Sequence, residues 1–274
     1  MLFGSADGLG SDRAQFFGAG DTFDWATTTS YLGFELFAGD FDDDGRDDLV
    51  MTVLFVRDGL GTRVVMGGST GLDASTSVIL LESVDARFGA VGDVNGDGFA
   101  DFVAASSGGS SAGVHVLAGG AGGLDTGSVS TIDVDTPGLP AGLDDQSSFG
   151  ASVAVGDINS DGIDDVLVGA TRLVVLKPGR RAATGGGAVV MFGTLDGVTT
   201  AGSQLWHQDI AGVGGVAESQ DSFGRSAHMG DFDADGHADG VIGVEYEHIT
   251  TSGTGKPSAG LAHVIYGALP APPS

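Results

Sequence analysis

The chain has 274 residues, among them 50 glycines, 7 prolines and no cysteine. Its formal net charge of −26 argues against nucleic acid as a partner, because phosphate recognition needs basic surfaces. The sequence contains no apolar run as long as a membrane span, and the high glycine content favours short strands joined by tight turns over helices.

One nine-residue pattern, D-x-[DN]-x-D-G-x-x-D, occurs four times along the chain, at residues 40–48, 93–101, 157–165 and 231–239. Side-chain oxygens at positions 1, 3, 5 and 9 can converge on one point if the backbone coils tightly, and the carbonyl of position 7 can join them. The glycine at position 6 is expected to permit the sharp turn, where a side chain would clash. Oxygen ligands without Cys or His favour a hard cation, and flexible coordination favours Ca²⁺ over Mg²⁺.

We therefore expect up to four Ca²⁺ ions, one in each loop, with side-chain ligands at positions 1, 3, 5 and 9 and a carbonyl ligand at position 7. The expected ligands are Asp40, Asp42, Asp44, Arg46 and Asp48 in the first loop; Asp93, Asn95, Asp97, Phe99 and Asp101 in the second; Asp157, Asn159, Asp161, Ile163 and Asp165 in the third; and Asp231, Asp233, Asp235, His237 and Asp239 in the fourth. The remaining acidic residues of the loops, Asp43, Asp47 and Asp164, are expected to add charge near the cation without touching it. The side chain of His237 is expected to face solvent.

The EF-hand shares the first half of this pattern but needs a bidentate Glu at position 12 and a helix after the loop. Position 12 is apolar in all four copies (Met51, Ala104, Val168 and Ile242), and the segments after the loops are short and strand-like. The EF-hand is therefore rejected.

Aligning the loops exposes a longer repeat. Phe149-Gly150 stands ahead of the third loop and Phe223-Gly224 ahead of the fourth. The second loop has a shortened version that begins with Phe88-Gly89, and the first has Leu32-Gly33. The strand-like run after the third loop ends in Gly169-Ala170-Thr171.

These features resemble the FG-GAP repeat of integrin α-subunit β-propellers and related bacterial proteins. The chain departs from that pattern at Leu32, in the contracted second repeat, and at Thr52 and Ala105, which replace the first Gly of the Gly-Ala-Pro segment. The resemblance implies an all-β fold, a β-propeller of four-stranded antiparallel blades, with four metal-loop repeats in this chain forming a partial or small propeller.

The repeats are expected at residues 32–87, 88–148, 149–222 and 223–267, all within one propeller domain, followed by a Pro-rich tail at 268–274. Residues 1–31 are interpreted as the second half of a preceding blade or as a closing strand, the latter near residues 13–17. We prefer the C-terminal part of a larger propeller over a closed ring of four blades.

The functional expectation is a non-enzymatic, calcium-binding module for adhesion or ligand binding, secreted to the cell exterior or cell surface, with its export signal outside this chain. By analogy with integrins, a protein or glycan ligand would meet the loops opposite the calcium loops, where residues 172–187 and 245–260 are matched insertions. The alternatives are the propeller portion of a secreted glycan- or lipid-active enzyme, or a structural surface protein that binds nothing specific.

Two further features of the sequence are a basic cluster and a match to a hydrolase motif. Lys177, Arg180 and Arg181 form a basic cluster that is either a solvated loop or a contact for acidic groups. Residues 67–71 match G-x-S-x-G, the nucleophile elbow of hydrolases, but the same turn in the other repeats lacks the serine and a strand-like run follows instead of a helix.

Overall fold

The computed structural model describes residues 3–5, 8–10, 14–17, 30–55, 59–82, 86–108, 112–176, 182–251, 254–256 and 258–268. Regular structure in these residues consists of strands and one 3-10 turn, η1 (Ala74–Thr76). No helix among them has the length and apolar character needed to cross a membrane. The expectation of an all-β fold is confirmed.

The strands form four main antiparallel sheets, each a simple meander. The first holds β3 (Ser30–Gly39), β4 (Asp48–Phe55), β5 (Gly59–Val65) and β8 (Val78–Glu82); the second holds β9 (Phe88–Gly92), β10 (Asp101–Ser106), β11 (Gly113–Leu117) and β12 (Val129–Ile132); the third holds β13 (Phe149–Gly156), β14 (Asp165–Ala170), β15 (Gly187–Phe192) and β16 (Thr199–Trp206); and the fourth holds β17 (Phe223–Gly230), β18 (Asp239–Val244) and β21 (Leu261–Ile265). Three short hairpins are β1 (Phe3–Ser5) with β2 (Gly8–Gly10), β6 (Gly67–Gly68) with β7 (Gly71–Leu72), and β19 (Ile249–Thr251) with β20 (Thr254–Lys256).

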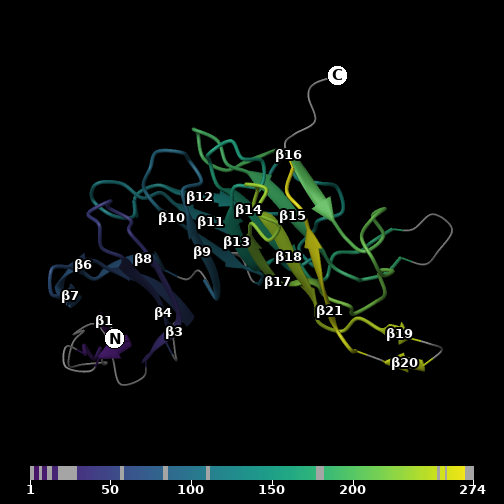
Figure 1. Cartoon of the computed structure of the whole chain (residues 1–274), viewed down its shortest axis with the longest axis horizontal. Helices are drawn as coiled ribbons and strands as arrows, with labels where there is room; N and C mark the ends of the chain where they lie inside the picture. Colours follow the sequence, from purple (N-terminus) through teal and green to yellow (C-terminus); the bar gives the residue numbers. More distant parts are fainter. Residues whose placement is uncertain are drawn as a thin grey trace.

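The four sheets follow one another in chain order, from the first at the left of Figure 1 to the fourth at the right. Their first strands pack side by side, β3 against β9, β9 against β13, and β13 against β17. Three successive four-stranded antiparallel sheets, and a fourth with three strands among the described residues, have neighbouring first strands and are compatible with a β-propeller.

The central strands are buried on both faces because each sheet lies between its neighbours. Every residue of β10, β11 and β14 is buried, which explains why these segments do not alternate between polar and apolar residues. The position-12 residues that excluded an EF-hand, Met51, Ala104, Val168 and Ile242, are buried core residues of the second strands.

The Phe-Gly pair builds an irregularity at the start of the first strand. Phe149 and Phe223 are buried, while Gly150 and Gly224 have φ values of +92° and +88°. The pairing register shifts just after each pair, and it shifts at the same place after Leu32 in β3. The contracted strand β9 pairs with β10 in continuous register, so the second repeat lacks this irregularity.

The structure also describes the G-x-S-x-G segment and most of residues 13–17. The G-x-S-x-G segment is the β6–β7 hairpin, which leads through η1 to strand β8, so it has none of the helix that a nucleophile elbow needs. A closing strand was expected near residues 13–17, of which residues 14–17 are described. These residues lie beside the first sheet rather than the fourth. The Gln15 side-chain amide donates a hydrogen bond to the Leu72 carbonyl and accepts one from the Leu72 amide, both at 3.1 Å.

Candidate metal centres

Each aspartate loop joins the first strand of a sheet to the second. The glycine just before the loop pairs with the position-9 aspartate just after the turn: Gly39 with Asp48, Gly92 with Asp101, Gly156 with Asp165 and Gly230 with Asp239. The four loops therefore start and end at equivalent places, and all four lie at the same ends of the strands.

The position-1 carboxylate organises the inside of each loop by accepting backbone N–H groups. In the third loop, the two oxygens of Asp157 accept the amides of Asp161 at 3.1 Å and Gly162 at 2.9 Å. The oxygen of Asn159 at position 3 accepts the Asp161 amide at 2.9 Å. The equivalent bonds occur in the other three loops, with Asp40, Asp93 and Asp231 as the position-1 acceptors and Asp42, Asn95 and Asp233 as the position-3 acceptors.

The position-9 carboxylate ties the loop to the end of the third strand. One oxygen of Asp165 accepts the amide of Ile158 at 3.0 Å, and the other accepts the amide of Gly193 at 2.9 Å. The same two bonds recur in every repeat, with Gly67, Gly119 and Gly267 as the donors beyond the third strand. The position-9 aspartates, Asp48, Asp101, Asp165 and Asp239, are at most 1% exposed. This residue is a structural link as well as an expected ligand.

Burial raises the pKa of three of these buried carboxyls, Asp48, Asp101 and Asp165. The pKa of Asp101 and that of Asp165 are each raised from 3.8 to about 6, because desolvation outweighs the backbone hydrogen bonds that each one accepts. Nearby loop carboxylates, Asp97 beside Asp101 and Asp161 beside Asp165, add to the rise. The folded chain thus favours the protonated carboxyl, a stabilising effect that is lost as the pH rises through about 6. A cation among these oxygens would oppose that loss.

The backbone of each loop is left-handed at two positions. The position-6 glycines have φ values between +84° and +91°, and a Cβ added there would meet nothing within 4 Å. Glycine is therefore favoured by the positive φ of the sharp turn, where a Cβ would crowd the local backbone, and not by contacts with more distant atoms. Position 4 also has positive φ in all four loops, at Asp43, Gly96, Ser160 and Ala234, a feature that sequence reasoning missed.

Three carboxylate oxygens lie close together in the first and in the fourth loop. One oxygen from each of Asp40, Asp42 and Asp44 lies within 4.8 Å of the others, and the same holds for Asp231, Asp233 and Asp239. Three carboxylate oxygens at this separation fit the donor set that Ca²⁺ takes in proteins. In the first loop, Arg46 forms an ion pair with Asp44, so a guanidinium partly neutralises this group.

Neighbouring loops contact one another. The Nδ1 atom of His237 lies 2.9 Å from the Ser160 hydroxyl, which also donates to the Gly236 carbonyl. The partly exposed His237 side chain thus also contacts the preceding loop, which the sequence did not predict. Asp164 also does more than add charge, since it bonds to the backbone of Asp93 in the preceding loop.

A polar cleft of about 620 Å³ lies at the opposite ends of the strands, between the third and fourth repeats. Its walls come from the segment after β14, the segment before β17 and the loop after β18; they include Arg172, Thr184, Glu218, Tyr246 and His248. Three non-glycine residues with positive φ, Gln220, Ser222 and Ser258, also line it. Such backbone conformations often mark functional sites.

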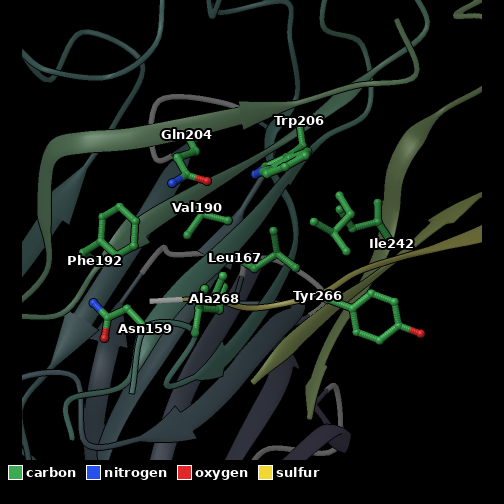
Figure 2. A pocket seen from close by; sticks show the side chains of 12 residues that line it. Asn159, Leu167, Val190, Phe192, Gln204, Trp206, Ile242, Tyr266 and Ala268 are labelled. Carbon is green, nitrogen blue, oxygen red and sulfur yellow. The ribbon is translucent and has the colours of Figure 1, made fainter. Parts of the chain in front are cut away.

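An apolar cleft of about 420 Å³ separates the third and fourth sheets. In Figure 2, Val190 and Leu167 lie at its centre, with Trp206 and Phe192 from the third sheet and Ile242 from the fourth around them. Polar atoms are contributed at its margin by Gln204, Asn159 and Tyr266, whose hydroxyl points away from the other labelled side chains (Figure 2). The polar cleft is the better candidate for a hydrophilic ligand.

The basic cluster of Lys177, Arg180 and Arg181 lies outside the described residues, as do parts of both matched insertions. The described parts of the insertions contribute Arg172, Thr184, Tyr246, His248 and Ser258 to the polar cleft. The two insertions are therefore brought together around one cavity, although sequence reasoning had only placed them on one face.

No curated protein matches the chain at a significant level. A family model does match residues 149–190, which run from the start of β13 through the third aspartate loop and β14 into β15. The family is the one that the Phe-Gly pair and the aspartate loop resemble in sequence. The model is that of the FG-GAP repeat, so an FG-GAP repeat is detected at residues 149–190, and the all-β fold of the described residues is compatible with a β-propeller that contains such repeats.

Proposed function

We propose that the chain is an integrin-like β-propeller module that binds up to four Ca²⁺ ions and recognises a ligand outside the cell. The observation that carries this proposal is the fourfold recurrence of one loop conformation with oxygens at positions 1, 3, 5 and 9. Each loop has the same hydrogen bonds to its position-1 and position-3 side chains, and two of the loops bring three carboxylate oxygens within 4.8 Å of one another.

The ligands of each ion would be the side chains at positions 1, 3, 5 and 9 together with the carbonyl of position 7. In the third loop these are Asp157, Asn159, Asp161 and Asp165, with the carbonyl of Ile163. An all-oxygen donor set on a flexible loop suits Ca²⁺ better than Mg²⁺, which demands a stricter octahedron. The cation would screen carboxylates that otherwise repel one another, so its binding free energy would add to folding stability.

Thermal unfolding in Ca²⁺, in Mg²⁺ and in EGTA tests the proposed calcium binding. At a free Ca²⁺ concentration a hundredfold above Kd, each site stabilises the folded chain by about 2.7 kcal/mol. With roughly 2–4 °C per kcal/mol for a chain of this size, we expect a rise of more than ten degrees that EGTA reverses and Mg²⁺ does not reproduce. A melting temperature that is the same in all three solutions would refute calcium binding.

The ligand is proposed to bind in the polar cleft, opposite the calcium loops, without being chemically changed. The cleft offers a guanidinium, an imidazole, a carboxylate and a partly exposed aromatic ring, from Arg172, His248, Glu218 and Tyr246. These groups suit a hydroxyl-rich glycan or a polar protein segment, because each hydrogen-bonds or stacks with such a partner.

A glycan array and a panel of cell-surface proteins, probed in Ca²⁺, would test this assignment. We expect Tyr246→Ala and Arg172→Ala each to weaken binding at least tenfold. Leu195→Ala is the matched control, because Leu195 is 80% exposed in the turn after β15, at the calcium-loop ends of the strands. Equal loss in all three variants would place the ligand elsewhere, and cleavage of a bound glycan would instead favour the enzyme alternative.

A further inference from the structure

Asp164 connects the third aspartate loop to the second. It is position 8 of the third loop, a place that the metal pattern leaves open. Its Oδ2 atom accepts the backbone amide of Asp93 at 2.9 Å, and its own amide donates to the Asp93 carbonyl at 2.8 Å. Asp93 is the first residue of the second loop, so both peptide groups around this expected ligand are held by the neighbouring repeat.

The backbone at Gly92 lies close to the Asp164 carboxylate. A Cβ atom at Gly92, the residue before Asp93, would lie 2.3 Å from Oδ2 of Asp164 and 2.4 Å from a methyl group of Val155. Gly92 is therefore needed for the carboxylate of Asp164 to reach the Asp93 amide. The Asp93 side chain in turn accepts the amides of Gly96, at 2.7 Å, and Gly98, at 2.8 Å, inside its own loop.

The next junction has only half of this link. The amide of Ala238, position 8 of the fourth loop, donates to the Asp157 carbonyl at 2.8 Å, as the Asp164 amide does to Asp93. Ala238 has no carboxylate, however, and cannot accept the amide of Asp157. The backbone bond is thus shared by both junctions, whereas the carboxylate bond is specific to the junction between the second and third repeats.

We propose that Asp164 is a positioning residue for the second calcium site. By holding the Asp93 amide, it fixes the orientation of the residue whose two oxygens organise the second loop and whose side chain would bind the cation. One calcium site is then completed by the following repeat, and its affinity depends on a residue that does not touch the ion. This inference rests on the calcium binding proposed above. It adds that Asp164, a residue outside the second loop, affects the calcium affinity of the second site.

The test is calcium titration by calorimetry on the whole chain. Asp164→Ala should weaken one of the four sites by at least about tenfold, the usual size of an outer-shell effect. Asp164→Asn keeps an acceptor oxygen, so it should weaken the same site by less than about threefold. Complete loss of the partner typically weakens a site by about tenfold. Asp47→Ala is the matched control, since Asp47 is the exposed position-8 residue of the first loop; it removes the same nearby charge and should weaken binding much less than Asp164→Ala does.

A double-mutant cycle identifies the affected site. Asp97→Ala removes the second site, so adding Asp164→Ala to it should cause no further loss of affinity. A similar loss in both backgrounds would overturn the proposal, because it would place the effect of Asp164 at another site. Unchanged affinities in Asp164→Ala alone would overturn it as well.

Amide exchange in EGTA separates this inference from the proposed function. In the calcium-free chain, the Asp93 amide should exchange at least tenfold faster in Asp164→Ala than in the wild type, while the Asp157 amide does not change. If the wild type binds no calcium, the proposed function fails and the positioning role with it, but a faster Asp93 amide would still show that the link exists. Calcium binding by the wild type with unchanged Asp93 exchange in Asp164→Ala would overturn the positioning role alone.

Discussion

The third and fourth aspartate loops have the same internal hydrogen bonds but different surroundings. In the third loop, Ile158 and Asn159 are partly buried, and the fourth repeat approaches through Ala238 and Gly267. In the fourth loop, Phe232, which corresponds to Ile158, is 59% exposed. The difference teaches that the conformation of a loop comes from its own nine residues, whereas its burial comes from the repeat that packs on it.

The first two loops support the same conclusion. Their position-2 residues, Phe41 and Val94, are fully buried, and the third-strand glycines of the next repeats, Gly119 and Gly193, lie against their carbonyls. A Cβ on either glycine would come within about 3.0 Å of the carbonyl oxygen that it faces. Close packing between repeats therefore covers position 2 wherever a following repeat is present in the described chain.

The largest expected effect contrasts the two phenylalanines at position 2. Phe41→Ala should destabilise the chain by about 3–5 kcal/mol, because it empties a fully buried site. Phe232→Ala should change the free energy of unfolding by no more than about 0.5 kcal/mol, because that side chain is largely in solvent. Urea unfolding in Ca²⁺ measures both, and equal losses would contradict the contrast between covered and uncovered loops.

A smaller effect compares calcium binding in the third and fourth loops. Asp161→Ala and Asp235→Ala should each remove one ion from the stoichiometry and about 2.7 kcal/mol of stabilisation at a hundredfold excess over Kd. Both residues are exposed and lie in loops with the same internal bonds, so the two losses should be alike and should disappear in EGTA. Calorimetry and melting in both solutions check this; a loss that persists in EGTA would show that the aspartate is structural.

The smallest effect concerns the two left-handed positions of the fourth loop. Gly236→Ala should destabilise the chain by about 1–2 kcal/mol, since an alanine is strained at a φ of +90°. Ala234→Gly should stabilise it by up to about 1 kcal/mol, because Ala234 already bears such strain at +61°. Urea unfolding in EGTA compares them, with Ala238→Gly as a control that should not stabilise. Stabilisation by both glycine substitutions would argue against left-handed strain as the cause.

Much of the fold could be predicted from local residue patterns. The register shift after the Phe-Gly pair was not predicted, but the apolar runs after each loop are the second strands, and short strands joined by turns build the fold, as expected. These predictions succeeded because strand propensity, turn glycines and loop hydrogen bonds act over a few neighbouring residues. The packing of first strand on first strand then follows from repetition of one unit.

Several features of the candidate site could not be predicted. The second role of the position-9 aspartate depends on a glycine amide beyond the third strand, 28 residues away for Asp165. The Asp164 bond to Asp93 spans 71 residues, and the Ser160 contact with His237 spans 77. A one-dimensional pattern treats Asp164 and Ser160 as residues between ligands, because it carries no information about which repeat faces them.

The sequence by itself determined that four aspartate turns with oxygens at set positions alternate with buried strands, because such turns and strands are specified by residues a few places apart. Only the tertiary structure decided which loops are covered, which insertions share the polar cleft and which carboxylate supports its neighbour's loop. These depend on how sheets far apart in the chain pack together, and that packing is set by the shapes of surfaces from several repeats at once.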